Sequence, residues 1–568
     1  MGAGTATGLS MGLAGCFGDS GNGTEGGTTE TEGSDGNDGG TETQSSDSND
    51  GGSDDKFGGT LNVTLQDEWT TLFPFKHARH PSAIQESQVA PRLAVFDYEA
   101  GETVPGAAES WEFVEGDGRQ LRVKIKEGLK FHKGYGEATA DDLVWTINSI
   151  LEEGFGGGWV KKFMWPTPPI QRAEKVDKYQ FDIISEDPFV PMVTGLLTNT
   201  RIISKAGVED LGDDQFAKTP VSVGPYEVVS AQIGSQATMK KFEDGHPAED
   251  LGYAGPGYAD EIVFTVSPDA SARLELLRSG DSDLLTIAPY NEISRLESNN
   301  KYTMKKRLGW NFDWLYVGGA KGRKPQREAL NDKKVRQAIA YAVDRTSYAE
   351  NAYFGEASPD DDPFVPSLEK NLVDHVDGQD THEYDIFPLK QNASKAKSLL
   401  EEAGWSDLEV ELTHKNTSIH SRAAQVLKGS IEESGITVTL NQVDDPTHAN
   451  LEREGKYDLL LSDISLLSPD FEQAVNYYMG DPVGDLNSMG YLNPDVDQMI
   501  RQSRMETDPK KRDAIFRDLF EVAVEDAPWV YLAHKQNPRT LGEGVHMDRD
   551  NFAPQAQFLD LTDVYKTS

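Results

Sequence analysis

The chain has 568 residues, 37% of them hydrophobic, so it is long enough for two folded bodies and too long for one compact core. Acids outnumber bases 95 to 54, which gives a formal net charge of −41. A field of that sign repels phosphate backbones and argues against nucleic acid as a partner. It favours a salt-loving host over the alternative of an ordinary acidic surface.

The only cysteine, Cys16, ends an N-terminal run of small and apolar residues, so no intrachain disulfide can form. The ending Leu13-Ala14-Gly15-Cys16 resembles the lipobox of prokaryotic lipoproteins, where the thiol receives a lipid after cleavage. The basic residues of a signal peptide are missing, so we expect the true start to lie upstream. A chance run of small residues is the alternative. We predict a signal-peptide remnant over 1–16 and lipidation at Cys16, which anchors the protein on the extracellular face of the membrane.

The segment 17–56 contains eleven acids and the single base Lys56, and Gly, Ser, Thr and Asn make up most of the rest. Such a segment has almost nothing to bury and repels itself, so it is predicted to be a disordered acidic linker. No later stretch approaches the roughly 18 apolar residues of a membrane span. The protein is therefore predicted to be anchored and not to span the membrane.

The folded part begins near Phe57, and residues 60–65 alternate apolar and polar side chains as a half-buried strand does. Because strands and helices mix along the chain, the predicted class is α/β with mixed sheets. Further strands are predicted at residues 121–125, 262–264, 410–412, 438–440 and 459–461.

Several helices are predicted from their end signals. Thr139 and Asp142 form a capping box ahead of apolar residues at helical spacing. Ser267 is predicted to cap a second helix, with Pro268 in its first turn and Gly280 at its end. Further helices are predicted over 332–344, over 393–403, and from Asp508 to a point before Pro528.

Seven phrases then occur in a recognisable order. The clearest are 103–111 (TVPGAAESW), leading through 127–132 (EGLKFH) to the helix after Thr139, and 333–345 (KKVRQAIAYAVDR). Together they resemble the dipeptide and oligopeptide-binding proteins of ABC transporters, family 5 of the extracellular solute-binding proteins, here in the form of a haloarchaeal-type lipoprotein. The other phrases lie at 224–226, 272–283, 395–405, 493–497 and 525–529.

The resemblance implies a two-lobed, periplasmic-binding-protein-like fold of the large peptide-binding class. Residues 57–308 would form lobe I, with an inserted subdomain at about 95–177. Lobe II would take 309–523, and 524–568 would return to lobe I. Small ligands usually bind in clefts between lobes, and such lobes close by hinge motion.

The resemblance further implies a monomeric substrate-binding receptor without a cofactor, which delivers a solute to the permease and ATPase subunits of an importer. It leaves the solute open between a dipeptide, an oligopeptide, an oligosaccharide and a metal chelate. It also does not separate an import receptor from one that feeds a chemosensor.

Catalytic signals are scarce. From residue 57 on there is no nucleophile elbow, zinc-protease helix or P-loop, so no catalytic residue is predicted. The hydrophilic segment 374–383 contains His375 and His382 among acids, but such loops are usually solvated, and no metal site is predicted. A secreted hydrolase that uses two carboxylates, such as a glycosidase, is the alternative function.

In peptide-binding members of the family, an Asp four residues before a Pro pairs with the ligand's α-ammonium. Here that Pro is Pro469 and the matching residue is Ser465, which cannot neutralise a cation. Asp463 lies two residues earlier and faces the same side of a strand, so it is the predicted substitute. The peptide ligand is therefore less firmly predicted than solute binding itself.

Aromatic residues complete the predicted site. Trp310 begins an alternating aromatic set where the chain should enter lobe II, and it is expected in the cleft wall beside Asn311. The later members, Phe312 and Tyr316, are expected in the lobe II core. By position in the family, Trp69, Thr71 and Tyr477 are further candidates for the cleft wall.

Overall fold

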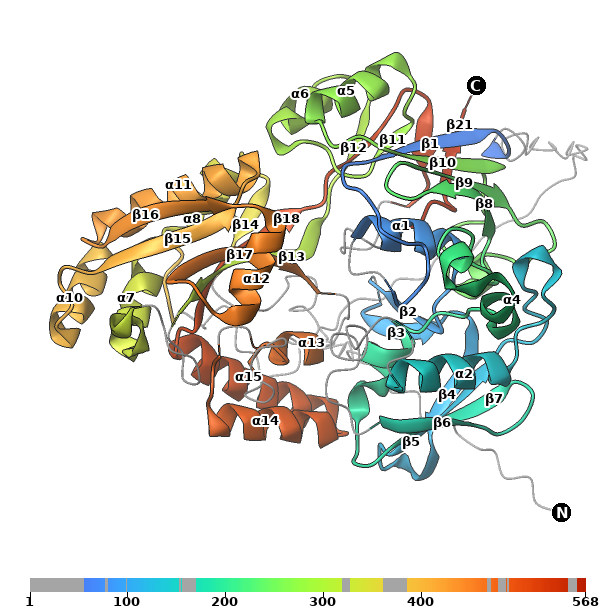
Figure 1. The fold of residues 1–568 in the computed structure, drawn as a ribbon, viewed down its shortest axis with the longest axis horizontal. Coiled ribbons are helices and arrows are strands. Elements are labelled where there is room, and N and C mark those ends of the chain that lie inside the picture. The colour runs from blue at the N-terminus through green and yellow to red at the C-terminus, as the bar shows by residue number, and fades with distance from the viewer. Residues whose placement is uncertain are drawn as a thin grey trace, which may run out of the picture.

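The chain forms two bodies, each built on its own sheet (Figure 1). We call them lobe I, which contains the first strands and the C-terminal strand, and lobe II. The computed structural model describes residues 56–76, 80–98, 100–152, 155, 170–318, 327–360, 386–466, 471–478, 487, 490–549 and 559–567.

A seven-stranded sheet lies at the centre of lobe I. Strand β1 (Thr60–Leu65), predicted with these bounds, runs parallel to both β10 (Glu261–Val266) and β11 (Leu284–Leu285). The sheet is completed by β8 (Tyr226–Gln232), β9 (Gln236–Lys241), β12 (Thr303–Lys305) and β19 (Arg539–Leu541). Around it lie α1 (His80–Val89), α4 (Lys205–Phe216), α5 (Ala270–Ser279), α6 (Ile293–Glu297) and the hairpins β2 (Ala94–Asp97) with β3 (Glu102–Pro105) and β20 (Val545–Met547) with β21 (Val564–Lys566).

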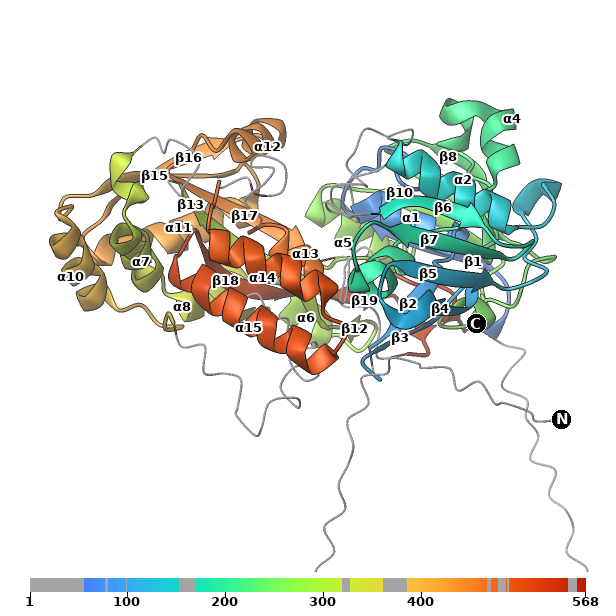
Figure 2. The same ribbon diagram turned by 90° about the horizontal axis from the view of Figure 1, so that it is seen from below.

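Lobe I also carries a four-stranded antiparallel sheet covered by helix α2 (Ala140–Leu151) (Figure 2). The capping box that predicts this helix is present, since the backbone N–H of Thr139 donates to Asp142 at 3.0 Å. The strands are β4 (Ala108–Phe113), β5 (Gln120–Ile125), β6 (Ile170–Lys175) and β7 (Gln180–Ser185), so this sheet extends past residue 177.

Helix α5 begins later than its sequence signals predict. Its N-cap is Asp269, whose side chain accepts a 2.8 Å hydrogen bond from the backbone of Ala272. The prediction of Ser267 as the cap is wrong. The carbonyls of Ser267 and Pro268 instead accept hydrogen bonds from the Arg273 guanidinium, which holds both residues outside the helix.

Lobe II is built on a mixed six-stranded sheet, and strand β13 (Leu308–Val317) lies between two antiparallel neighbours, β17 (Leu459–Ser465) and β18 (Trp529–Gln536). The remaining strands are β14 (Ala357–Pro359), β15 (Glu409–Lys415) and β16 (Thr437–Val443). The helices are α7 (Lys333–Ala342), α8 (Arg345–Ala352), α10 (Ala393–Ala403), α11 (Ser418–Glu433), α12 (Asp445–Glu454), α13 (Glu472–Val475), α14 (Pro494–Met505) and α15 (Pro509–Glu525).

The helix predicted over 332–344 is in fact two helices. Helix α7 ends at Ala342, because Val343 has an extended backbone with ψ 126°. Asp344 then acts as the N-cap of α8 and accepts a 2.6 Å hydrogen bond from the backbone of Ser347. An Asp near the predicted C-terminus was therefore the start signal of the next helix.

The chain crosses between the lobes twice, from β12 to β13 and from β18 to β19 (Figures 1 and 2). The two crossovers are hydrogen-bonded to each other, with the backbone N–H of Asn537 donating to the carbonyl of Arg307 at 2.8 Å. Because β18 pairs with β13 in the lobe II sheet, the return to lobe I follows Gln536, later than the predicted boundary at residue 524.

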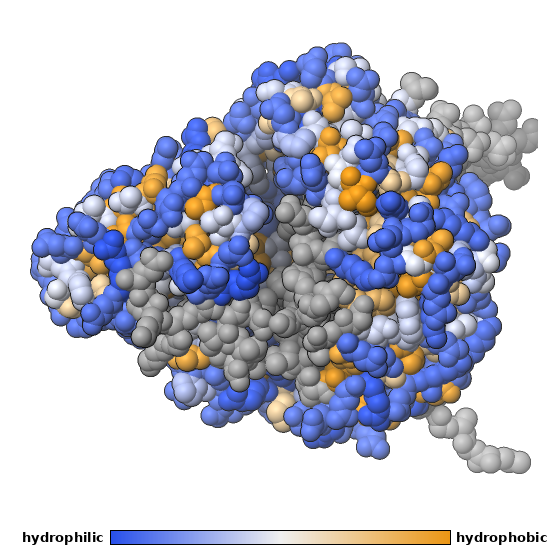
Figure 3. All heavy atoms as spheres, viewed as in Figure 1, coloured by the Kyte–Doolittle hydropathy of each residue, from blue (hydrophilic) through white to orange (hydrophobic). Residues whose placement is uncertain are grey.

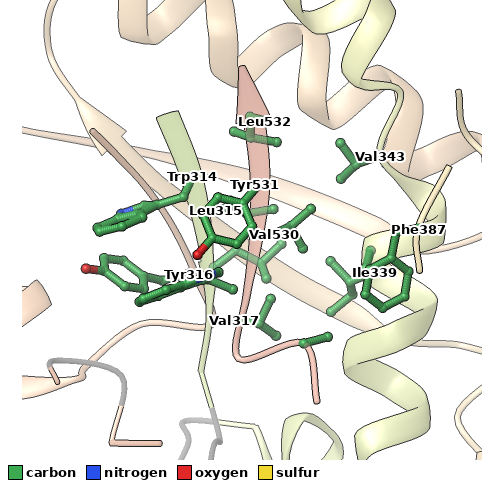
Figure 4. Packing of buried hydrophobic residues seen from close by; sticks show 14 of the residues in the cluster. Trp314, Leu315, Tyr316, Val317, Ile339, Val343, Phe387, Val530, Tyr531 and Leu532 are labelled. Carbon is green, nitrogen blue, oxygen red and sulfur yellow. The ribbon is translucent and has the colours of Figure 1, made fainter. Parts of the chain in front are cut away.

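The aromatic residues of β13 after Trp310 pack in the lobe II core, as predicted for Phe312 and Tyr316. Figure 4 shows Trp314 and Tyr316 in this core. Trp314 lies between them and stacks on Trp529 of β18, with ring centroids 4.6 Å apart. These rings occupy one face of the sheet, so the intervening residues Asn311 and Asp313 point to the other face.

Candidate functional site

Four strand ends meet at one edge of the lobe II sheet. Strands β15 and β17 are parallel, so both end at this edge, whereas β13 begins there and β18 ends there. Both crossovers leave from the same edge, so it faces lobe I. Hydrophilic residues predominate on the described surface of both lobes that Figure 3 shows. Binding sites of α/β proteins usually lie outside the carboxyl ends of strands.

Trp310 lies at this edge and is fully buried. Its ring contacts Phe96 and Tyr98 of lobe I, with centroids 6.1 Å and 5.6 Å away. Its carbonyl accepts a 3.0 Å hydrogen bond from the backbone of Leu466, which follows β17. Trp310 thus contacts residues of lobe I, and its role in the wall of a ligand cleft stays a prediction.

Asn311 and Ser465 are register partners across β13 and β17. Asn311 is half-buried, and its Oδ1 is buried without a hydrogen-bond partner among the residues that the structure describes. Its amide lies over the α-carbon of Gly309, where any side chain at 309 would collide with it. The absence of a side chain at 309 therefore leaves the room that the Asn311 amide occupies.

Asp463 is the half-exposed carboxylate of the edge, with 31% of its side chain exposed, and it is already paired within the chain. Its Oδ1 lies 3.0 Å from Nζ of Lys415 and 3.3 Å from Nε2 of His420, and its Oδ2 lies 3.5 Å from Nζ of Lys535. Burial alone would raise the pKa of Asp463, but Lys415 and Lys535 hold it well below its usual range. We call these four residues the edge cluster.

Asp313 lies directly opposite Asp463 in the register and is buried. It accepts hydrogen bonds from Nζ of Lys535 at 2.8 Å, from the Tyr348 hydroxyl at 2.6 Å and from the Tyr353 hydroxyl. Burial alone would lower the pKa of Lys535, but the carboxylates of Asp313 and Asp463 outweigh it and raise that pKa. Lys535 therefore stays charged between two carboxylates.

Lobe I reaches this region through Tyr290. Its ring packs edge-on against Tyr353 at 5.2 Å, and its hydroxyl donates to the carbonyl of Gln536 at 2.9 Å. Trp310 and Tyr353, which donates to Asp313, thus both contact aromatic residues of lobe I.

Other predicted site residues lie elsewhere. Trp69 is buried in the lobe I core, and the Thr71 hydroxyl accepts the backbone N–H of Phe73 at 3.0 Å within a turn. Tyr477 packs in the lobe II core, 5.2 Å from the Trp314 ring. Cys16, Pro469 and the segment 374–383 lie outside the described residues.

The described part of the chain shows no group of three or more His, Cys, Asp or Glu placed to hold a metal ion. None of its helices is long and apolar enough to cross a bilayer. A depression of about 460 Å³ lies on one side of α11, the helix that also carries His420 of the edge cluster. It is lined by Ser418, Ser421, Arg422, Gln425 and Val426 of that helix alone.

Lys415, His420 and Lys535 are missing from the predicted site. The available signal was Asp313 itself, a charge inside a run of buried aromatic residues, which requires a buried partner. The identity of that partner depends on β18 pairing with β13, and this pairing joins residues 222 positions apart.

Comparison with known proteins gives a family match. The family described as bacterial extracellular solute-binding proteins, family 5, matches residues 102–484. The oligopeptide-binding protein AppA of Bacillus subtilis is 25% identical over 465 residues, covering 77% of this chain and 79% of AppA. The nickel-binding protein NikA of Staphylococcus aureus is 24% identical, covering 75% and 82%. The periplasmic binding protein DppA of Helicobacter pylori, solved with the peptide STSA, has a TM-score of 0.77 at 21% identity, covering 91% of this chain and 99% of DppA.

Proposed function

Because the chain belongs to family 5 of the bacterial extracellular solute-binding proteins, we propose that it captures a peptide between its lobes for an ABC importer. Its role is that of the substrate-binding receptor, which hands the solute to a membrane permease. The proposal of a peptide draws on AppA, an oligopeptide-binding protein, and on DppA, whose structure contains the peptide STSA.

The observation that carries this proposal is the meeting of four strand ends at the edge facing lobe I. There the buried Trp310 touches both lobes, and the half-exposed Asp463 lies on the neighbouring strand. An apolar wall beside a few polar groups is the usual composition of a small-ligand site. We propose Asn311, Asp463 and Ser465 as the ligand-facing polar residues of lobe II, and Trp310, which is buried on the opposite face of β13, as the apolar contact between the lobes at the same edge.

The hydrolase alternative has no support. The relatives named above are binding proteins, and a glycosidase needs one carboxyl group that stays protonated until it donates. The pKa of Asp463 is held well below its usual range by Lys415 and Lys535, so this group is ionised at neutral pH.

The proposal is tested by isothermal titration calorimetry with a pool of short peptides, followed by mass spectrometry of the recovered pool. We expect saturable binding by a monomer and recovery of the bound peptides unchanged. Steady loss of peptides with new products appearing would contradict the receptor role.

We further propose that the protein is a lipoprotein of a salt-loving host, tethered through Cys16 by the acidic segment 17–56. The Leu-Ala-Gly-Cys ending and the eleven acids that follow support this proposal. The Cys16→Ser variant, expressed in its host from the full gene, is expected in the medium. Its retention in the membrane fraction would argue against the tether.

A further inference from the structure

The carboxylate of Asp463 is within reach of solvent at the edge facing lobe I, yet cations of the chain already occupy both of its oxygens. Lys415 lies 3.0 Å from Oδ1, with His420 3.3 Å from the same atom, and Lys535 lies 3.5 Å from Oδ2. A ligand cation that approached Asp463 would therefore meet two ammonium groups that are already in place.

The two lysines differ in what else holds them. Lys535 is held mainly by a buried partner, because it donates to Asp313 at 2.8 Å and its own side chain is only 10% exposed. Lys415 stands at the end of β15 with 21% of its side chain exposed. Its second carboxylate, Asp445, is 3.8 Å away and mostly solvated. Lys415 is thus the outer ammonium partner of Asp463, and its removal would leave His420 as the remaining partner of Oδ1.

Both members of the pair formed by Lys415 and Asp463 are charged. Asp463, followed by Asp445 and Glu452 of helix α12, raises the pKa of Lys415, although burial opposes this change. An ammonium group added beside Asp463 would lie within a few ångströms of Lys415, and repulsion between like charges in a partly buried site is costly. Binding proteins obtain specificity through such repulsive elements as well as through attractive contacts.

We infer that Lys415 is a specificity-determining residue of the proposed peptide site, which fills the place on Asp463 that a ligand ammonium would otherwise take. This inference rests on the proposed function. The wild-type protein accordingly accepts peptides whose amino terminus is blocked, or whose amino terminus binds away from Asp463. Without Lys415, Asp463 becomes an anchor for a free α-ammonium.

The test compares two pools of tri- to pentapeptides that differ only in N-terminal acetylation. Retention of each pool is measured by equilibrium dialysis and mass spectrometry for the wild type, Lys415→Met and Lys415→Gln. The matched control is Lys334→Met, which removes a lysine paired at 2.9 Å with Glu402 on the surface of helices α7 and α10. Thermal unfolding checks that each variant is folded. If Lys415→Met does not fold, Lys415→Gln is used in its place.

We expect the wild type and Lys334→Met to bind the two pools within about threefold of each other. The Lys415 variants should favour the free-amine pool by about tenfold or more, which corresponds to about 1.4 kcal/mol. An unchanged ratio in the Lys415 variants, or a strong preference of the wild type for free amines, would overturn the inference while leaving peptide binding intact. If neither pool binds to the wild type, the proposed function itself fails, and the inference fails with it.

Discussion

The buried ion pair between Asp313 and Lys535 gives the sharpest quantitative prediction. Both residues are buried, and their charged atoms are 2.8 Å apart. Removing one partner of a buried pair typically costs about 3–5 kcal/mol, because the other charge is left uncompensated. We expect Asp313→Asn to lie near the lower end of that range, since Lys535 keeps Asp463 at 3.5 Å. Lys535→Met should cost at least as much, since Asp313 then keeps only hydroxyl donors.

The double variant should cost about 2–4 kcal/mol less than the sum of the two single variants, because neither charge is then left alone. The measurement is chemical denaturation followed by the fluorescence of the lobe II tryptophans, fitted to the lobe II transition. The control is the same cycle on the exposed pair Lys334 and Glu402, where no measurable coupling is expected. A coupling below about 1 kcal/mol for Asp313 and Lys535 would refute the assignment of a stabilising buried pair.

Two further predictions concern lobe I and helix α11. Gly224→Ala should lower the free energy of unfolding by about 1–3 kcal/mol or more, because a Cβ there would lie 2.2 Å from the backbone oxygen of Val89. Gly429→Ala should raise the melting temperature slightly, because a Cβ there meets no atom within 4 Å and Ala favours a helix over Gly. Equal shifts for the two glycines would contradict the steric argument. His132 is buried, with Nε2 donating to the Gly224 carbonyl and Nδ1 accepting the backbone N–H of Ser222, and burial lowers its pKa to about 4. Because the unfolded chain binds this proton near pH 6.5, stability should fall as the pH drops from about 6.5 to 4, and His132→Gln should flatten that slope in urea titrations.

Local elements were predictable where the chain carries its own end signals. The strand at 60–65 and the helix at 393–403 have the predicted bounds, since alternation and the terminal Gly404 each act over a few residues. The errors arose where two signals compete within one segment. Asp344 is predicted as the end of one helix although it caps the next, and Ser267 is predicted as a cap although Asp269, two residues later, has that role.

The site was predictable only in part. The position of Trp310 followed from the order of the elements, because the start of the first lobe II strand must lie near the crossover. The state of Asp463 did not follow, since its partners come from β15, β18 and α11, and no local pattern links these segments. The strand pattern predicts which face Asp463 lies on, but only the assembled sheet shows that basic side chains of the same chain already pair with it.

The register of β13 and β17 explains why this edge needs a third strand. It places Asp313 directly opposite Asp463, and like charges at such cross-strand positions repel each other. Lys535 of β18 lies between the two carboxylates and relieves that repulsion, so β18 is an electrostatic requirement of the site as well as a neighbour in the sheet. One residue later β18 ends at Gln536, whose carbonyl binds Tyr290 of lobe I, and the second crossover begins. The charge balance of the edge and the path between the lobes therefore depend on the same strand.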